Sequence, residues 1–278
     1  MKKIVELFGL HCQQSMPMLK NALKRQLCPF TGTKCVKTRK SQPSIAIGTC
    51  TISYQEDDVI ICPFRLLDKN QIFIDCLHLL TAHEPGNQIH LIPEVQIPGG
   101  NVDYFLVSAR NDKVMDFVGI ELQTMDTTGT VWPERQRLLS KQGVKVSQKD
   151  IDNTRSFGIN WKMTAKTILV QMHHKARSFE SINKHLVLIV QEPLMQYMMR
   201  EFDFSHVSEP LIGNTVHFHS YELNNVNGAL KFSLASRKST DAAGIGKCLG
   251  FREEPSVELQ ELLALLESKL SDCNLLLF

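Results

Sequence analysis

The 278-residue sequence lacks any apolar run long enough to cross a bilayer, and its first residues lack the apolar stretch of a secretory signal. We therefore expect a cytoplasmic protein with no membrane partner. In that reducing compartment, eight cysteines favour metal ligands or free thiols over disulfides. An apolar content of 43% and a charged content of 22% are typical of a globular protein with one large domain, or a core domain with an accessory one.

Acidic residues are absent from two stretches of the chain. None occurs between Leu7 and Gln55, or between Asn153 and Phe179, although both stretches carry several lysines and arginines. Basic segments on either side of an acidic centre fit a polyanion that is held at its flanks and attacked in the middle. The alternative is two solvated surfaces on which basic residues cluster by chance.

The acidic centre lies between these two stretches. Pro98–Val107 and Val118–Gln123 have the apolar character of two strands, and the first carries Asp103. Side chains alternate along a strand, so Glu121 and Gln123 share one face of the second. Buried carboxylates are costly unless they are paired or bind a metal, and hard oxygen ligands suit Mg²⁺. The alternative is that both acids are solvent-facing residues of a hairpin.

Cysteines with the spacing C-x6-C-x14-C-x11-C occur in the first basic stretch and just beyond it: Cys28, Cys35, Cys50 and Cys62. Four thiolates in a tetrahedron bind zinc or iron. The chain lacks the C-x2-C pair of a common zinc ribbon, and four free core thiols are the alternative. We interpret the remaining cysteines as ordinary thiols: Cys12, Cys76, Cys248 and Cys273.

Periodic apolar residues predict the other elements of the chain. We expect helices over 64–80, 161–177, 193–204 and 257–270, and strands over 89–97, 186–190, 216–223 and 230–235. The helix over 161–177 carries an apolar stripe beside a basic face with Lys162, Lys166, His173 and Arg177. The long polar stretch before it, from Gln123 to Asn160, favours a functional loop over a bare connection.

Two sets of motifs together resemble the NotI family of type II restriction endonucleases, which includes EagI-like enzymes. The first is the four-cysteine pattern with its two Cys-Pro-Phe turns. The second is Asp103 followed by Glu121-Leu-Gln123, with Asp126-Thr-Thr-Gly-Thr and Asn160-Trp-Lys-Met-Thr-Ala-Lys166 beyond. The likeness runs from about Val5 to Tyr197.

The resemblance implies an α/β (α+β) fold, a PD-(D/E)XK nuclease-like mixed sheet flanked by helices. It implies a metal-binding, DNA-contacting module over residues 1–80 and a catalytic and recognition domain over residues 81–278. In this family the four-cysteine module binds iron, whereas the spacing alone does not distinguish iron from zinc. The expected activity is Mg²⁺-dependent, sequence-specific hydrolysis of double-stranded DNA.

The resemblance also implies roles for individual residues. Asp103 and Glu121 match the metal-binding carboxylates, with a main-chain carbonyl near Leu122 as a further ligand. Gln123 stands where most such nucleases carry lysine, and Val102 precedes Asp103 in place of the proline of the motif name. Glu94 is either an additional acid near the ion or a plain strand glutamate.

For the DNA, the resemblance implies a homodimer that reads a GC-rich palindrome. We expect base readout by Arg155, because its fork pairs with guanine. The other expected DNA contacts are Asn160, Lys162, Lys166, Lys37 and Arg39. A noncatalytic DNA-binding protein with a structural four-cysteine site is the alternative function.

Overall fold

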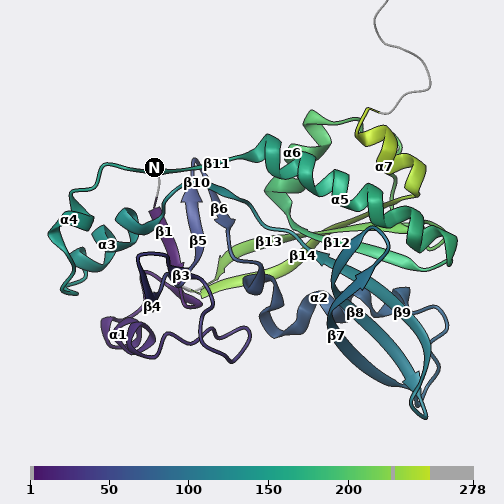
Figure 1. The fold of residues 1–278 in the computed structure, drawn as a ribbon, viewed down its shortest axis with the longest axis horizontal. Helices are drawn as coiled ribbons and strands as arrows, with labels where there is room; N and C mark the ends of the chain where they lie inside the picture. The colour runs from purple at the N-terminus through teal and green to yellow at the C-terminus, as the bar shows by residue number, and fades with distance from the viewer. Residues whose placement is uncertain (1–2, 227–228, 251–278) are drawn as a thin grey trace, which may run out of the picture.

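The computed structural model describes residues 3–226 and 229–250; the predicted helix over 257–270 and Cys273 lie outside them. The N-terminal part of the elongated molecule contains a four-stranded sheet in the order β2-β1-β5-β6 (Figure 1). The sheet consists of β1 (Lys3–Leu7), β2 (Leu10–His11), β5 (Thr49–Tyr54) and β6 (Asp57–Ile60). The same part of the molecule also contains α1 (Met16–Arg25) and a two-stranded sheet of β3 (Thr38–Arg39) and β4 (Gln42–Ala46).

The larger part of the molecule is a six-stranded sheet in the order β14-β13-β12-β9-β8-β7. The central β12 is parallel to both of its neighbours, and the other pairs are antiparallel, so the sheet is mixed. The strands are β7 (Gln88–Ile97), β8 (Gly100–Arg110), β9 (Lys113–Leu122), β12 (His185–Gln191), β13 (Val216–Val226) and β14 (Ala229–Thr240).

Helical segments cover both faces of this sheet (Figure 1). On one face lie α5 (Trp161–Ser181), α6 (Glu192–Glu201) and α7 (Ala242–Cys248); on the other lie η1 (Pro63–Asn70), α2 (Gln71–Cys76) and η2 (Leu77–Leu79). A separate cluster of buried apolar residues fills each interface. The predicted class, a mixed sheet flanked by helices, is therefore confirmed.

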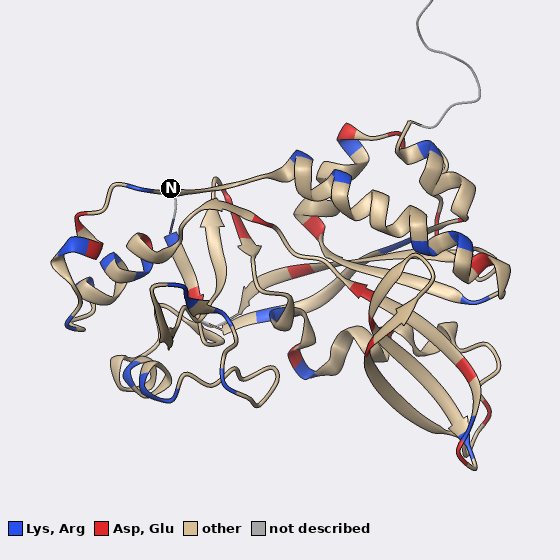
Figure 2. Ribbon diagram, viewed as in Figure 1, with Lys and Arg blue, Asp and Glu red and all other residues tan. Residues whose placement is uncertain are grey.

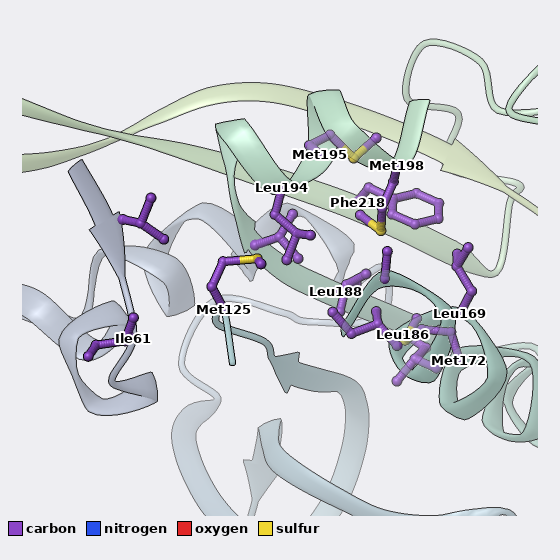
Figure 3. Close-up of a cluster of buried hydrophobic side chains, with 14 of the residues drawn as sticks. Ile61, Met125, Leu169, Met172, Leu186, Leu188, Leu194, Met195, Met198 and Phe218 are labelled. Atoms are coloured by element: carbon purple, nitrogen blue, oxygen red, sulfur yellow. The ribbon is translucent and has the colours of Figure 1, made fainter. Parts of the chain in front are cut away.

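The apolar pattern explains why α5 packs where it does. Its predicted stripe is buried, and Leu169 and Met172 lie against Leu186 and Leu188 of β12 (Figure 3). β12 is apolar at consecutive positions because helices cover both of its faces. The remaining predicted strands and the helix at α6 also match the structure within a few residues at their ends.

The helix expected over 64–80 is interrupted, which corrects that prediction. The backbone leaves the helical region at Asp68, and Lys69 and Asn70 have positive φ angles of 53° and 56°. The break allows Leu66 before it and Ile72 after it to be buried against the same sheet, while Ile74 faces solvent. A continuous helix would impose one fixed stripe along its length.

The long segment after Gln123 is partly ordered into short elements and returns to the N-terminal part of the molecule. It contains β10 (Thr127–Gly129), α3 (Trp132–Lys141), α4 (Gln148–Ile151) and β11 (Phe157–Ile159). The Arg135 side chain donates to the carbonyl oxygen of Ile47 at 2.6 Å, and Asp150 forms an ion pair with Arg39 at 2.9 Å. Residues that follow the acidic strands in sequence thus pack on residues near position 40.

A buried ion pair connects the two parts of the molecule. Arg65 Nε lies 3.0 Å from Glu6 Oε1, and the two side chains are 2% and 3% exposed. The Thr51 hydroxyl donates to Glu6, and Arg65 also donates to the carbonyl oxygen of Leu230. Because breaking such a pair leaves an uncompensated buried charge, it fixes β1 against the larger part of the molecule. Among the described residues, no helix is long and apolar enough to cross a membrane.

Histidines lie buried where η2 covers β13. His217 and His219 are 1% and 0% exposed, and the His78 ring stacks on His219 with centroids 5.9 Å apart. Burial, followed by the nearby charge of His185, lowers the pKa of His217 to about 4. Burial, followed by the charge of Arg237, lowers the pKa of His219 to about 3.

These two histidines should make the protein sensitive to acid. Below about pH 6.5 these histidines are protonated in the unfolded chain but stay neutral in the folded chain. The free energy of unfolding therefore falls by about 1.4 kcal/mol per pH unit for each histidine. The loss should extend down to the folded pKa values near 4 and 3. Urea unfolding between pH 7.5 and 4.5 measures it, and His219→Gln should reduce the slope. An unchanged slope in His219→Gln would contradict this account.

Candidate active site

Three acidic side chains lie in one row across β7, β8 and β9. β7 pairs Pro93 with Tyr104 and Val95 with Val102 of β8, so Glu94 lies level with Asp103, at a point where its φ of 53° interrupts the regular pairing. The register of β8 with β9 pairs Tyr104 with Ile120, so the next step places Asp103 opposite Glu121. Opposed residues of neighbouring strands have Cβ atoms roughly 4.5–5.5 Å apart. Sheet pairing therefore brings together carboxylates that are distant in sequence.

Asp103 is half-buried and accepts a hydrogen bond from the backbone. The amide of Leu122 donates to Asp103 Oδ2 at 2.7 Å. Burial raises the pKa of Asp103, the Leu122 amide and Lys175 lower it, and the charge of Glu94 raises it. Removal from water is thus the dominant influence on this carboxyl group.

Glu121 is buried against α5. Its Oε1 lies 2.6 Å from Nζ of Lys175, and the two side chains are 3% and 6% exposed. The same ammonium donates to the carbonyl oxygen of Asn101 at 2.5 Å. Burial raises the pKa of Glu121 to about 7, even though Lys175 lowers it; the charge of Asp103 raises it.

The turn between β7 and β8 docks directly on α5. Gly99 has a φ of 101°, and a Cβ atom there would lie 2.7 Å from the carbonyl oxygen of His174. The Ser178 hydroxyl donates to the carbonyl oxygen of Pro98 at 2.9 Å. A side chain at position 99 would push the turn away from the helix, so glycine permits the approach that brings Lys175 to Asn101.

Gln123 follows the last residue of β9 and, like Glu121, reaches α5. Its Nε2 is 3.5 Å from Oε1 of Gln171, one helical turn before Lys175. Sequence reasoning did not single out Gln171 or Lys175. The available signal was a lysine three residues after buried Met172, on the apolar stripe of the helix.

The residues expected to contact DNA differ in their surroundings. Arg155, Lys162 and Lys166 are exposed, and Figure 2 shows basic segments along α5. Asn160 caps α5, because its side-chain oxygen accepts from the amide of Met163 at 3.3 Å. Asn160 therefore has a structural role, because it caps the N-terminus of α5.

Two other expected DNA contacts have partners within the protein. Lys37 Nζ donates to the carbonyl oxygen of Ile61 at 2.6 Å. Arg39 pairs with Asp150 and lies over the Trp132 ring, 4.5 Å from its centroid. The long basic stretch is therefore not uniformly a solvated surface.

The four N-terminal cysteines line one cavity of about 110 Å³ together with Phe8, Pro29 and Phe64. They come from the turn after α1, the start of β5 and the end of β6. Burial raises the pKa of Cys62, and burial followed by the charges of Glu6 and Cys62 raises that of Cys50. Buried thiols stay protonated unless a cation replaces the protons. In the part of the chain that the structure describes, no three or more His, Cys, Asp or Glu side chains stand in metal-binding geometry.

Comparison with known proteins identifies the family. The family model described as Restriction endonuclease NotI matches residues 17–229, which include the cysteine cavity, the acidic row and α5. A search of curated proteins finds no match. Since the matched region covers well over half of the 278 residues, the chain belongs to the NotI restriction endonuclease family.

Proposed function

We propose that this protein is a type II restriction endonuclease that hydrolyses phosphodiester bonds of double-stranded DNA at a specific site and depends on Mg²⁺. The observation that carries the proposal is the row formed by Glu94, Asp103 and Glu121 within a chain of this family. The row lies beside an exposed basic helix edge, as cleavage of a polyanion requires.

The acidic row suits a divalent cation. Lys175 forms an ion pair with Glu121, and burial raises the pKa of both Asp103 and Glu121. A cation held by these two carboxylates and a main-chain carbonyl near Leu122 would offset the repulsion between them. When bound, Mg²⁺ polarises the scissile phosphate and lowers the pKa of a water molecule.

The remaining residues position the reactants. The Gln123 amide cannot accept a proton at neutral pH, so it orients water by hydrogen bonding. Gln171 is its neighbour on α5 and lies within reach of the same water. Glu94 adds a third negative charge at the edge of the row.

Removing either central carboxylate should abolish cleavage without abolishing binding. We expect Asp103→Ala and Glu121→Ala to lower the cleavage rate by at least about 10²-fold, because each loses a ligand that stabilises developing charge. Specific binding should persist or tighten, since a carboxylate that faces the phosphate is lost. Gln123→Lys should keep measurable activity.

The assay is Mg²⁺-dependent conversion of plasmid DNA into discrete bands, with binding measured in Ca²⁺. Asp112→Ala, an exposed acid in the turn between β8 and β9, is the matched control and should cleave normally. Cleavage near the wild-type rate in both active-site variants would leave a noncatalytic DNA-binding protein as the better description.

We further propose that α5 and the loop before it meet the DNA, as part of a homodimer on a GC-rich palindrome. Lys166 lies on the exposed edge of the helix that carries Lys175, so it is placed to meet the scissile backbone. Arg155 is exposed in the preceding loop, where its guanidinium is free to reach a base edge. Lys162 would add a second phosphate contact on the same helix.

Lys166→Ala and Arg155→Ala should separate backbone contact from base readout. Lys166→Ala should weaken binding to all sequences and reduce the log–log salt slope by about one. Arg155→Ala should cost roughly 1–3 kcal/mol at one base pair and relax specificity there. Binding to the cognate site and its single-base variants across several salt concentrations tests both. An unchanged slope for the first, or an equal loss on all DNA for the second, would show that the roles are misassigned.

For the cysteine cavity we propose a structural iron or zinc site. Four thiols facing one largely apolar cavity provide the donor set for either ion. The buried Sγ atoms would have to lose their protons and draw together on binding, which couples metal affinity to pH.

Cys50→Ser should lower metal content and thermal stability together, because one of four shared ligands is lost. Metal analysis of the wild-type protein should find about one tightly bound ion per chain, coloured if it is iron. Cys12→Ser is the control, since Cys12 lies outside the cavity, and it should retain the ion. Full metal retention in a Cys28→Ser, Cys62→Ser double variant would refute a shared site.

A further inference from the structure

We propose that Lys175 is a positioning residue of the cleavage reaction, holding Glu121 in place and standing in for the lysine that Gln123 replaces. This inference rests on the proposed endonuclease function. The new element is that a side-chain ammonium needed for cleavage comes from the helix α5 and lies outside the strand motif that carries Asp103 and Glu121.

The contacts of Lys175 fix its ammonium tightly. Nζ lies 2.6 Å from Glu121 Oε1 and 2.5 Å from the carbonyl oxygen of Asn101, and the residue is 5% exposed. An ammonium has three N–H donors, so these bonds leave one more for a ligand of the site. A long, flexible side chain is thereby held in a single geometry between β9 and the start of β8.

The charge of Lys175 is required where it lies. Glu94, Asp103 and Glu121 bring three negative charges into one row, and Lys175 brings a positive charge to the most buried of them. A buried carboxylate without a partner is strongly destabilised and moves toward solvent or takes up a proton. The ammonium therefore keeps the Glu121 oxygens directed into the site.

The position of Lys175 explains how Gln123 can occupy a lysine position. Gln123 faces Gln171, and Glu121 faces Lys175 one turn further along α5. Both pairs connect the same face of β9 to the same edge of the helix. A lysine at position 123 would approach Glu121 along the strand. Here the ammonium that meets the Glu121 carboxylate comes from α5 instead.

The closely docked turn supports the same arrangement. A Cβ atom on Gly100 would lie 3.3 Å from Lys175 Cε, and one on Gly99 would strike the backbone at His174. The two glycines let the turn close over the lysine stem, and Asn101 then supplies the carbonyl that accepts from it.

The experiment compares Lys175→Met and Lys175→Arg with the wild type in single-turnover DNA cleavage and in DNA binding with Ca²⁺. We expect Lys175→Met to cleave about 10²-fold more slowly, a loss typical of a misplaced site. Its DNA binding should stay within about threefold, since a loss confined to the rate marks positioning. Lys175→Arg should recover part of the rate because it keeps the charge.

Lys184→Met is the matched control. Lys184, just before β12, pairs through Nζ with buried Asp116 of β9 at 2.6 Å, away from the acidic row. Its loss should lower the melting temperature without slowing cleavage. If Lys184→Met slows cleavage as much as Lys175→Met does, the effect is general destabilisation and the inference fails.

Two further comparisons test the mechanism. Thermal unfolding of Glu121→Gln, Lys175→Met and the double variant should be non-additive, because the two side chains act as a pair; additive shifts would overturn the contact. Adding Gln123→Lys to Lys175→Met should restore at least about tenfold of the rate, a return of roughly 1.4 kcal/mol. No recovery would overturn the replacement of the motif lysine.

The possible failures are distinguishable. Absence of cleavage by the wild-type protein would overturn the endonuclease proposal and this inference with it. Wild-type cleavage with an unimpaired Lys175→Met variant would overturn the inference alone. If Lys175→Met does not fold, Lys175→Arg provides the comparison, because it keeps the charge but moves its position; an unimpaired cleavage rate in that variant would overturn the inference.

Discussion

The structure around the active site depends on one constraint, which is that three carboxylates lie together across neighbouring strands and that two of them, Asp103 and Glu121, are largely removed from water. Like charges at this spacing repel one another, and a low local dielectric strengthens the repulsion. The row therefore requires cations from outside the sheet. One comes from α5 through Lys175, so the helix must lie close, and the close turn at Gly99 makes that possible.

Local periodicity made the sheet and its acids predictable. Alternation predicted that Glu121 and Gln123 share one face, and pairing through the turn at Arg110 to Lys113 predicted that Asp103 lies beside them. The register that brings Asp103 opposite Glu121 also requires a bulge between Ser108 and Ala109, which shifts the pairing by one residue. Because the side-chain period is two, a one-residue shift decides which face of the sheet a side chain joins, and periodicity did not predict this bulge. Lys175 was not predictable in the same way, because its meeting with Glu121 depends on how a helix docks across the sheet, and helical periodicity marks its position as core.

The N-terminal part shows a different limit. The sequence indicated four related cysteines, and they do line one cavity, although their spacing follows no common ribbon. The basic character of the same stretch gave no indication that Arg39 is paired with Asp150 or that Lys37 bonds to Ile61. Composition describes charge along the chain, whereas exposure depends on partners that can be distant in sequence, 111 residues away for Arg39.

The return of α3 and α4 to the N-terminal part has a consequence for how the protein folds during synthesis. The hydrogen bond from Arg135 to Ile47 spans 88 residues, and the pair of Arg39 with Asp150 spans 111. Closing such long loops costs entropy before any contact forms, which slows folding. The first 60 residues cannot complete their packing on the ribosome until Gln191 has emerged, because its side chain bonds to the backbone of Asp58 and Ile60. By then the strands that carry Asp103 and Glu121 have already been made. The N-terminal part therefore cannot finish folding before the strands of the active site have been synthesised, although it is made first.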